Sequence, residues 1–321
     1  MAGAAPASDD PAGRTGPAGR ADIRAAGPWR HRWVSANGIR LHLVEAGEGP
    51  LVVLLHGFPE FWWSWRHQLV GLAGTGHRVV AVDLRGYGDS DKPPRGYDLW
   101  TLAGDVAGLI RALGERQAVV VGHDWGGLIG WTLAALHPRL VRALVVLGAP
   151  HPLTLRRELW RSAFRRGPRP WPHLLGFQLP LLPERSLRAD RGHRVERLLR
   201  DWSGPGWAAA PEFAEAVRRN RAAMLVAGTA HCALEYHRWA VRSQLRGDGR
   251  RFARALARPL AQPMLQVHGA LDPCFPEATA AASGRWAPSR DYHVLPDCGH
   301  FPHQEAPRGC TRLIADFLRA V

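Results

Sequence analysis

An aspartate stands at the centre of a glycine-flanked turn between an expected strand and an expected helix. The apolar run Val119–Val121 leads into Gly122–Gly126, which reads GHDWG, and a helical pattern follows. A strand–turn–helix around Gly-x-Asp-x-Gly has the form of a nucleophile elbow, with Asp124 where serine is more common. Gly122 and Gly126 are expected to leave room where a Cβ would meet neighbouring backbone. The alternative interpretation is an aspartate that only caps the helix.

The aspartate decides which chemistry such a turn can carry out. A serine needs a base to remove its proton, whereas a carboxylate is already ionised at neutral pH. Attack by a carboxylate on an ester or amide would give an anhydride, which is a poor intermediate. Attack on a saturated carbon gives an alkyl ester that water can hydrolyse. Asp124 therefore predicts displacement at a saturated carbon, such as opening an epoxide or expelling a halide.

Hydrolysis of an alkyl ester requires a base to activate water and an acid to orient that base. After an elbow of this kind the acid comes first along the chain and the histidine second. Asp272 follows the expected strand Met264–His268, and His300 follows the expected strand Asp291–Leu295. We assign Asp272 as the orienting acid and His300 as the base. In isolation each would pass for an ordinary turn aspartate or loop histidine.

A tight turn follows the first expected parallel strand, Leu51–Leu55, and begins with the sequence HGFP at His56. Such a turn can aim the backbone N–H of Phe58 into the site. With the N–H of Trp125 it would form an oxyanion hole for the tetrahedral intermediate of ester hydrolysis. The side chains of His56 and Trp125 are predicted to contact the substrate.

The elements around these positions predict an α/β fold with a mostly parallel, doubly wound sheet. An opening hairpin with its turn at Asn37-Gly38 precedes strands that alternate with helices at short spacing, which favours parallel pairing. From about His151 to Arg258 no strand is convincing, and helices such as Pro211–Leu225 are expected instead. This block is predicted to cover the carboxyl edge of the sheet. The predicted organisation is a disordered tail at 1–28, a core at 29–150 and 259–321, and an inserted helical cap at 151–258.

The bulk composition excludes several classes of protein. The 321-residue chain has a formal net charge of +14, and arginine supplies almost all of it because Lys92 is the only lysine. The arginines are spread through every segment and form no nucleic-acid-binding module, so no nucleic-acid partner is expected. No apolar run approaches the ~18 residues of a membrane span, and the first thirty residues lack the apolar part of a secretory signal. Stable membrane insertion is therefore not expected.

The cysteines and histidines give no indication of a metal. The four cysteines, Cys232, Cys274, Cys298 and Cys310, form no CxxC pair, so free thiols in a reducing, cytoplasmic compartment are expected. His303, Cys298 and Asp297 lie near His300, but no second group of ligands has a convincing spacing. The sequence thus predicts neither a metal nor an organic cofactor, and it assigns no oligomeric state.

Four motifs together resemble the α/β-hydrolase-fold epoxide hydrolases, which are related to haloalkane dehalogenases. The motifs are HGFPEFWWSWRHQ at His56–Gln68, RGYGDSDKP at Arg85–Pro93, GHDWGG at Gly122–Gly127 and CGHFPHQEAP at Cys298–Pro307. The resemblance covers roughly Trp33–Val321. It implies a helical cap after the sixth core strand, an ester formed on Asp124, and hydrolysis of that ester by water that His300 and Asp272 activate.

The chain departs from the family pattern in the cap. Members of this family usually carry two cap tyrosines that bind the epoxide oxygen and protonate the leaving alkoxide. Leu174–Glu184 resembles the first tyrosine region but has Phe177 there, and Leu234–Arg238 resembles the second but has His237 in register. Because adjacent helical residues point about 100° apart, His237 and Tyr236 are both candidate proton donors, of which one would face the site. The alternative is that one packs inside the cap and the other faces solvent. Phe177 is predicted to bind the substrate, and the many aromatic residues of the cap predict that this substrate is a small apolar epoxide.

Two alternatives remain open from the sequence. A haloalkane dehalogenase would use the same nucleophile and needs no proton donor, because halide leaves unaided; it needs N–H donors, which Trp125 and the cap tryptophans could supply. A non-catalytic, basic cap protein that binds membranes or anionic ligands is the second alternative. Its support is a stripe of Arg157, Arg161 and Arg165 opposite aromatic residues.

Overall fold

An eight-stranded, mostly parallel sheet forms the centre of the protein. A computed structural model describes residues 22–164 and 172–321. The strands lie in the order β1-β2-β4-β3-β5-β6-β7-β8; β1 and β2 are antiparallel to their neighbours, and all the other pairs are parallel. Their bounds are β1 Arg30–Ala36, β2 Ile39–Ala46, β3 Leu51–Leu55, β4 Arg78–Val82, β5 Ala118–His123, β6 Val141–Leu147, β7 Met264–Gly269 and β8 Asp291–Leu295.

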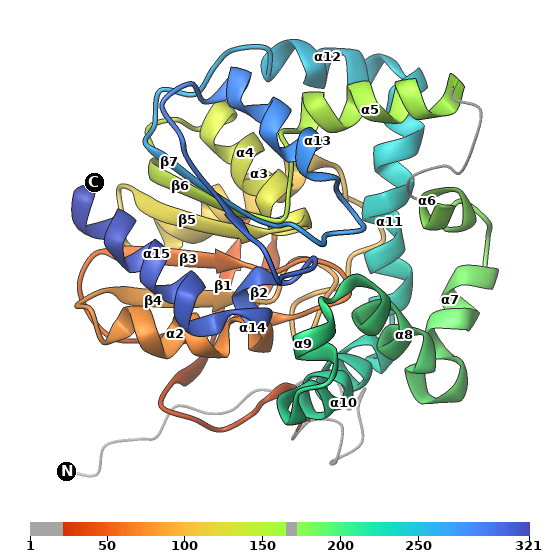
Figure 1. Cartoon of the computed structure of the whole chain (residues 1–321), viewed down its shortest axis with the longest axis horizontal. Coiled ribbons are helices and arrows are strands. Elements are labelled where there is room, and N and C mark those ends of the chain that lie inside the picture. The colour runs from red at the N-terminus through yellow and green to blue at the C-terminus, as the bar shows by residue number, and fades with distance from the viewer. Residues whose placement is uncertain (1–21, 165–171) are drawn as a thin grey trace.

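Helices cover both faces of the sheet, which is why the central strands are continuous apolar runs. All five residues of β3 and all six of β5 are buried. Helices α3 and α4 pack together on one face, and α2 and α15 pack together on the other (Figure 1). The core helices are η1 Trp62–Trp65, α2 Arg66–Ala73, α3 Leu99–Ala112, α4 Trp125–Leu136, α13 Glu277–Ala281, η4 Ala282–Trp286, α14 Pro302–Glu305 and α15 Pro307–Ala320. The predicted fold class is confirmed.

Between β6 and β7 the described residues form helices and no strand. Figure 1 shows these helices gathered beside one end of the sheet, the end at which β5 runs into α4. We refer to residues 152–255 as the cap. Its elements are α5 Pro152–Phe164, α6 Pro172–Gly176, α7 Leu182–Arg188, η2 Ala189–Gly192, α8 His193–Trp202, α9 Pro205–Ala208, α10 Pro211–Leu225, α11 Thr229–Arg242, η3 Ser243–Leu245 and α12 Gly247–Ala255. Within the described part of the chain, no helix is long and apolar enough to cross a membrane.

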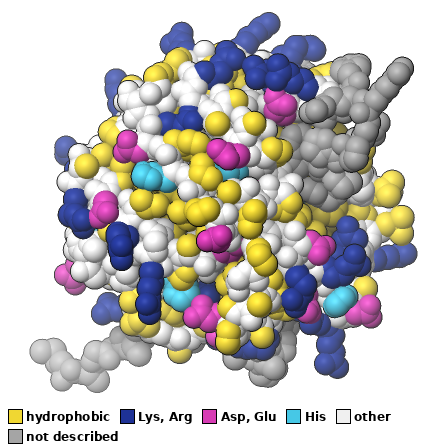
Figure 2. All heavy atoms as spheres, viewed as in Figure 1, with side chains coloured by type: hydrophobic (Ala, Val, Ile, Leu, Met, Phe, Trp, Pro, Cys, Tyr) yellow, Lys and Arg dark blue, Asp and Glu magenta, His cyan; other side chains and the backbone are white. Residues whose placement is uncertain are grey.

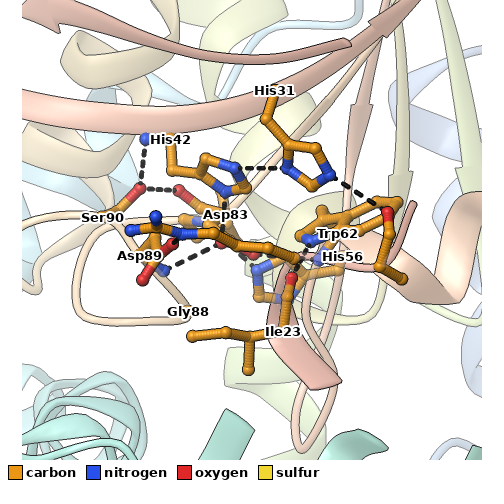
Figure 3. Close-up of polar contacts among 12 residues, drawn as sticks. Ile23, His31, His42, His56, Trp62, Asp83, Gly88, Asp89 and Ser90 are labelled. Atoms are coloured by element: carbon orange, nitrogen blue, oxygen red, sulfur yellow. Dashed lines mark hydrogen bonds and ion pairs between the residues drawn. The ribbon is translucent and has the colours of Figure 1, made fainter. Parts of the chain in front are cut away.

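The segment before β1 packs against the core, contrary to the predicted tail. Residues 1–21 of that tail lie outside the described residues, but Ile23 is 1% exposed and its carbonyl accepts the indole N–H of Trp62 at 2.8 Å (Figure 3). The ring of His31 donates to the Ala25 carbonyl and contacts His42, which in turn lies 2.7 Å from the Asp83 carboxylate. The prediction that residues 22–28 are disordered is therefore wrong. A composition rich in Ala, Gly and Pro did not reveal that one isoleucine would be buried.

Candidate active site

Asp124 lies at a sharp turn between β5 and α4. Its backbone has φ +48° and ψ −114°, a conformation that a non-glycine residue rarely adopts. A Cβ at Gly122 would lie 2.2 Å from the Gly126 carbonyl oxygen, and one at Gly126 would lie 2.1 Å from the Leu55 carbonyl oxygen. Both glycines are thus required, as expected. The side chain of Asp124 forms no helix-cap hydrogen bond, so the simple capping role is excluded.

Two backbone N–H groups hold the carboxylate of Asp124. The N–H of Phe58 donates to Oδ2 at 2.9 Å, and the N–H of Trp125 binds the same carboxylate. The other oxygen, Oδ1, lies 3.8 Å from Nε2 of His300. One carboxylate oxygen therefore occupies the expected oxyanion hole, while the second faces the expected base.

His300 and Asp272 form the partner pair. Nδ1 of His300 lies 3.0 Å from Oδ2 of Asp272, and both side chains are buried. The other oxygen of Asp272 accepts the backbone N–H groups of Cys274 at 2.7 Å and Phe275 at 3.1 Å. With Nδ1 bound to the carboxylate, Nε2 is the nitrogen that His300 presents to Asp124. The structure thus brings together three residues that lie up to 176 positions apart in the sequence.

Burial and mutual charge set the ionisation of this group. Burial raises the pKa of Asp124, although His300, His123 and the two backbone N–H groups act in the opposite direction. Burial also opposes ionisation of Asp272, but the charge and hydrogen bond of His300 hold the pKa of Asp272 below its usual value. Burial disfavours the charged form of His300, yet the charge of Asp272 brings the pKa of His300 well above its usual value. A buried, charge-coupled group of this kind is typical of an active site.

A mostly apolar pocket opens onto these groups. Its walls come from both the core and the cap, so a substrate would be enclosed between the two. The residues that line it are Phe58, Asp124, Trp125, Leu128, Leu155, Leu159, Leu174, Trp202, His237, Ala240, Cys274, Phe275 and His300. A second apolar pocket shares five of these walls and extends toward Trp239 and Phe252.

The chain resembles known proteins of one family in its sequence. The family model of the alpha/beta hydrolase fold matches residues 50–307. Among curated proteins, the AB hydrolase superfamily protein YfhM of Bacillus subtilis is 43% identical over 164 residues, which are 49% of this chain and 56% of that protein. Epoxide hydrolase B of Mycobacterium tuberculosis is 50% identical over 126 residues, 37% of this chain and 35% of that protein. The matches thus span about half or less of the length of these relatives.

Solved structures match over nearly the whole chain. An epoxide hydrolase from an endophytic Streptomyces is 31% identical with a TM-score of 0.79, covering 92% of this chain and 96% of its own. The chain belongs to the α/β-hydrolase-fold epoxide hydrolase family. A mutant of the epoxide hydrolase of Bacillus megaterium, complexed with its naphthyloxy-propanediol product, is 26% identical with a TM-score of 0.73, covering 90% of this chain and 100% of its own.

The two tyrosine positions of the epoxide hydrolase family have different surroundings in this chain. Phe177 is 1% exposed and packs edge-to-face on Phe58 and His237, with ring centroids 5.7 and 5.1 Å apart. It is not among the described residues that line the pocket, so the prediction that Phe177 binds the substrate is wrong. His237 lines the pocket, as one of the two candidates was expected to do. Tyr236 is fully buried beside Tyr87 and Tyr97, and its hydroxyl donates to the Arg85 carbonyl at 2.7 Å. Tyr236 therefore does not present a proton to the pocket, and its prediction as a donor is wrong.

The contacts of His237 determine which nitrogen carries its proton. Nδ1 lies 3.0 Å from the carbonyl of Ala233, which can only accept, so Nδ1 is protonated. Nε2 accepts the indole N–H of Trp125 at 3.1 Å. The ring in this state is neutral, with its lone pair directed to Trp125 at the pocket wall.

His56 binds the backbone of two loops and does not line the pocket. Its Nδ1 donates to the Gly57 carbonyl at 2.9 Å, and its Nε2 accepts the N–H of Leu84 at 3.1 Å. The ring is fully buried and is not among the described residues that line the pocket. The prediction that His56 contacts the substrate is therefore wrong. His56 instead fixes the loop that carries the N–H of Phe58.

Sequence reasoning missed a buried polar cluster directly behind the elbow. His123, the residue before Asp124, contacts the Glu60 carboxylate through Nδ1 at 2.8 Å and donates from Nε2 to the His300 carbonyl at 2.7 Å. Burial opposes ionisation of Glu60, but His303 and His123 hold its pKa well below the usual value. Gln304 also donates to Glu60. The cluster ties the elbow, the oxyanion loop and the His300 loop together; its signal in the sequence was the glutamate that follows HGFP.

Two groups of described residues have the spacing of metal ligands. One is Glu60, His123 and His303; the other is Asp272, Cys274 and His300. In each group a carboxylate already accepts from a histidine, and burial raises the pKa of the Cys274 thiol to about 12, which disfavours the thiolate form that metals bind. Cys298 and Asp297 belong to neither group.

Proposed function

We propose that the protein hydrolyses an apolar epoxide to a vicinal diol. The observation that carries the proposal is the geometry of Asp124, with Oδ2 bound by the N–H of Phe58 and Oδ1 facing His300. A carboxylate in that place forms an ester with a saturated carbon, and His300 with Asp272 can then activate water. The names of the relatives, which are epoxide hydrolases, support the same activity.

In the first step, Oδ1 of Asp124 attacks an epoxide carbon, and the bond from that carbon to the epoxide oxygen breaks. The oxygen takes a proton and becomes a hydroxyl group. We assign this proton to His237, because it is the cap residue with an ionisable donor nitrogen at the pocket. The neutral ring already uses its Nδ1 proton toward Ala233, so it must first take up a proton at Nε2. This protonation breaks the hydrogen bond that Nε2 accepts from the indole N–H of Trp125.

In the second step, His300 takes a proton from water, and the resulting hydroxide attacks the ester carbonyl carbon of Asp124. The N–H groups of Phe58 and Trp125 stabilise the oxyanion of the tetrahedral intermediate. Its collapse releases the diol oxygen, which takes the proton from His300, and regenerates Asp124. Ester formation removes the negative charge of Asp124, which lowers the pKa of His300 and makes it a base when one is needed.

The pocket lining supports an apolar substrate and a closed site. Leu128, Leu155, Leu159 and Leu174 surround the reacting groups together with the rings of Trp202 and Phe275. The B. megaterium relative was solved with an aryloxy diol as its product, which has this apolar character. We also propose a reducing, cytoplasmic location, because all four cysteines are buried free thiols.

The decisive experiment is intact-protein mass spectrometry on a His300→Gln variant, incubated separately with epoxides and with haloalkanes. Without its base, the variant should accumulate the ester on Asp124, and a mass increase equal to a whole epoxide is expected. An increase equal to an alkyl group without its halogen would favour the dehalogenase alternative. No adduct with any compound of a broad panel would leave the non-catalytic alternative.

A further inference from the structure

The cap carries an exposed apolar patch on the same segment that lines the active-site pocket. Four leucines of α6, α7 and the turn between them form this leucine patch: Leu175, Leu179, Leu181 and Leu182, exposed by 51%, 51%, 63% and 59%. They account for four of the eleven large hydrophobic side chains exposed in the described part of the chain. Figure 2 shows hydrophobic side chains at the right edge of the molecule, where Figure 1 places α6 and α7.

The inner face of the same segment belongs to the site. Leu174 lines the pocket that contains Asp124 and His300, and Phe177 packs on Phe58. Arg238, which is 3% exposed, holds this turn through bonds to the Phe177 and Leu179 carbonyls at 3.0 and 2.9 Å. One short stretch of chain thus separates the apolar pocket from an apolar outer surface.

Arginines follow the leucine patch along the chain. Arg185, Arg188, Arg191, Arg194 and Arg197 are all exposed, and none of them forms an ion pair with a residue of 22–164 or 172–321. The nearby Glu184 is already paired with Arg238, and Glu196 with Arg200 and Arg221. Figure 2 shows Lys and Arg side chains beside the hydrophobic ones at this edge. Residues 172–202, which hold the leucine patch, contain six arginines and four acidic residues, a net charge of +2, so the surroundings of the patch are cationic overall.

We propose that the leucine patch and these arginines dock the cap on an anionic membrane surface. Leucines that enter the acyl boundary, with arginines at the level of the headgroups, form the usual interfacial arrangement. Charge decides between this occupant and a second copy of the chain. Residues 152–255 hold 21 arginines and 9 acidic residues, so two caps brought face to face would repel each other. A nucleic-acid backbone would neutralise the arginines but would leave the leucines in water.

Docking in this orientation would place the bilayer beside the α6–α7 segment, whose Leu174 lines the pocket on its inner side. An apolar epoxide dissolved in the membrane would then be concentrated next to the cap. This consequence rests on the proposed function, whereas membrane binding itself does not. Reversible docking of this kind is also compatible with the absence of a membrane-spanning helix in the described residues.

The test is co-sedimentation of the full chain with unilamellar vesicles of phosphatidylcholine, with or without about 30% phosphatidylglycerol, at about 0.05 and 0.5 M NaCl. The wild-type protein should bind the anionic vesicles roughly tenfold better than the neutral ones, and high salt should weaken this binding. The variant L175S/L179S/L181S/L182S and the variant R185Q/R188Q/R194Q should each lose roughly tenfold in binding. L245S, at a cap leucine that is 77% exposed outside the patch, should bind like the wild type.

The outcomes separate this inference from the proposed activity, because vesicle binding is measured without any substrate. Turnover of a small water-soluble epoxide, or the melting temperature if there is no turnover, shows that each variant is folded. Wild-type protein that stays in the supernatant with every vesicle would overturn the proposal. So would a leucine variant that binds like the wild type. A wild-type dimer that the leucine substitutions dissociate, without vesicle binding, would assign the patch to a second copy.

Discussion

The cap and the remainder of the protein differ sharply in charge and in how their residues are held. The cap holds 21 arginines and 9 acidic residues, a net charge of +12, whereas the other 217 residues hold 21 basic and 19 acidic residues, a net charge of +2. In the core, backbone geometry fixes the reacting groups: the turn of Asp124 leaves no space at its glycines, and backbone N–H groups hold its carboxylate. In the cap, side chains such as His237 face the pocket from helices.

This difference suggests a division of tasks between the two regions. In the proposed mechanism the core provides the nucleophile, the base and the oxyanion hole, and misplacing such groups by about 1 Å is costly for catalysis. The cap provides the wall of the pocket, the proposed ring-opening acid and the outer surface. The two departures from the family pattern, Phe177 and His237, both lie in the cap, whereas the four motifs that resemble the family lie in the core. Four experiments test whether the division holds.

Replacement of the nucleophile should have the largest effect. Asp124→Ala is expected to lower kcat about 10⁴-fold or more, because no covalent intermediate can form. His237→Phe should lower kcat by about 10²-fold to 10³-fold, the usual contribution of a general acid. Single-turnover kinetics distinguish the two regions: His237→Phe should slow ester formation and leave ester hydrolysis unchanged. His237→Tyr, which restores a phenol at this position, should recover most of the loss.

The proposed division of tasks between core and cap is contradicted if His237→Phe slows ester hydrolysis and leaves ester formation unchanged. The proton donor would then lie elsewhere, and the cap would only shape the pocket.

Addition of a single methyl group should destabilise the protein strongly when it is made at a core glycine and hardly at all when it is made at a cap glycine. In Gly126→Ala the new Cβ would lie 2.1 Å from the Leu55 carbonyl oxygen, and rigid backbone on both sides prevents relief. We expect a loss of roughly 4 kcal/mol in the free energy of unfolding, or no folded protein. Gly206→Ala in α9 of the cap meets no atom within 4 Å and should change stability by less than about 0.5 kcal/mol. Urea unfolding measures the free energy of unfolding of both variants. Equal losses in the two would contradict the difference expected between core and cap.

Acid should destabilise the core through a buried histidine. His303 is fully buried, and burial lowers its pKa to about 4, whereas an unfolded histidine titrates near 6.5. Below pH 6.5 the unfolded chain binds a proton that folded His303 does not, so stability is complete above 6.5 and falls as the pH drops toward 4. The loss from this residue should reach roughly 3 kcal/mol.

Unfolding free energies of the wild type and His303→Gln, measured between pH 7 and pH 4, test this expectation. The variant should lose less stability over that range than the wild type. His193→Gln, at an exposed histidine on α8 of the cap, is the matched control and should leave the pH dependence unchanged. Parallel pH curves for the wild type and His303→Gln would rule out the buried histidine as the cause.

These contrasts also explain which features could be predicted from the sequence. The buried strands, the elbow and the order of Asp272 and His300 follow from local patterns, and the helix expected at Pro211–Leu225 has those bounds in the structure. Tyr236 and His237 could not be separated, because one residue of helical register turns a side chain by about 100°. The cluster of Glu60, His123 and His303 joins three distant segments, so no local spacing revealed it.

The smallest expected effect concerns the charge of the cap surface itself. Arg197 on α8 has two like charges, Arg194 and Arg200, three residues away on either side and one opposite charge, Asp201, four residues further on, which leaves one like charge in excess; all four residues are exposed. Like charges at this spacing destabilise a helix by a few tenths of a kcal/mol. Arg197→Gln, which keeps the helix propensity, should therefore raise the free energy of unfolding by about 0.3 kcal/mol at low salt.

The core supplies a control on α15 for this charge effect. Arg312 is exposed and has one like charge, Arg308, and one opposite charge, Asp316, at four residues' distance, so Arg312→Gln should have no net effect. Both variants should match the wild type at about 0.5 M NaCl, where exposed charges are screened. Equal stabilisation by the two substitutions at low salt would mean that charge repulsion is spread evenly over the molecule. A gain confined to Arg197→Gln would show that the cap keeps its positive surface at a cost in stability, as expected for a surface that binds an anionic partner.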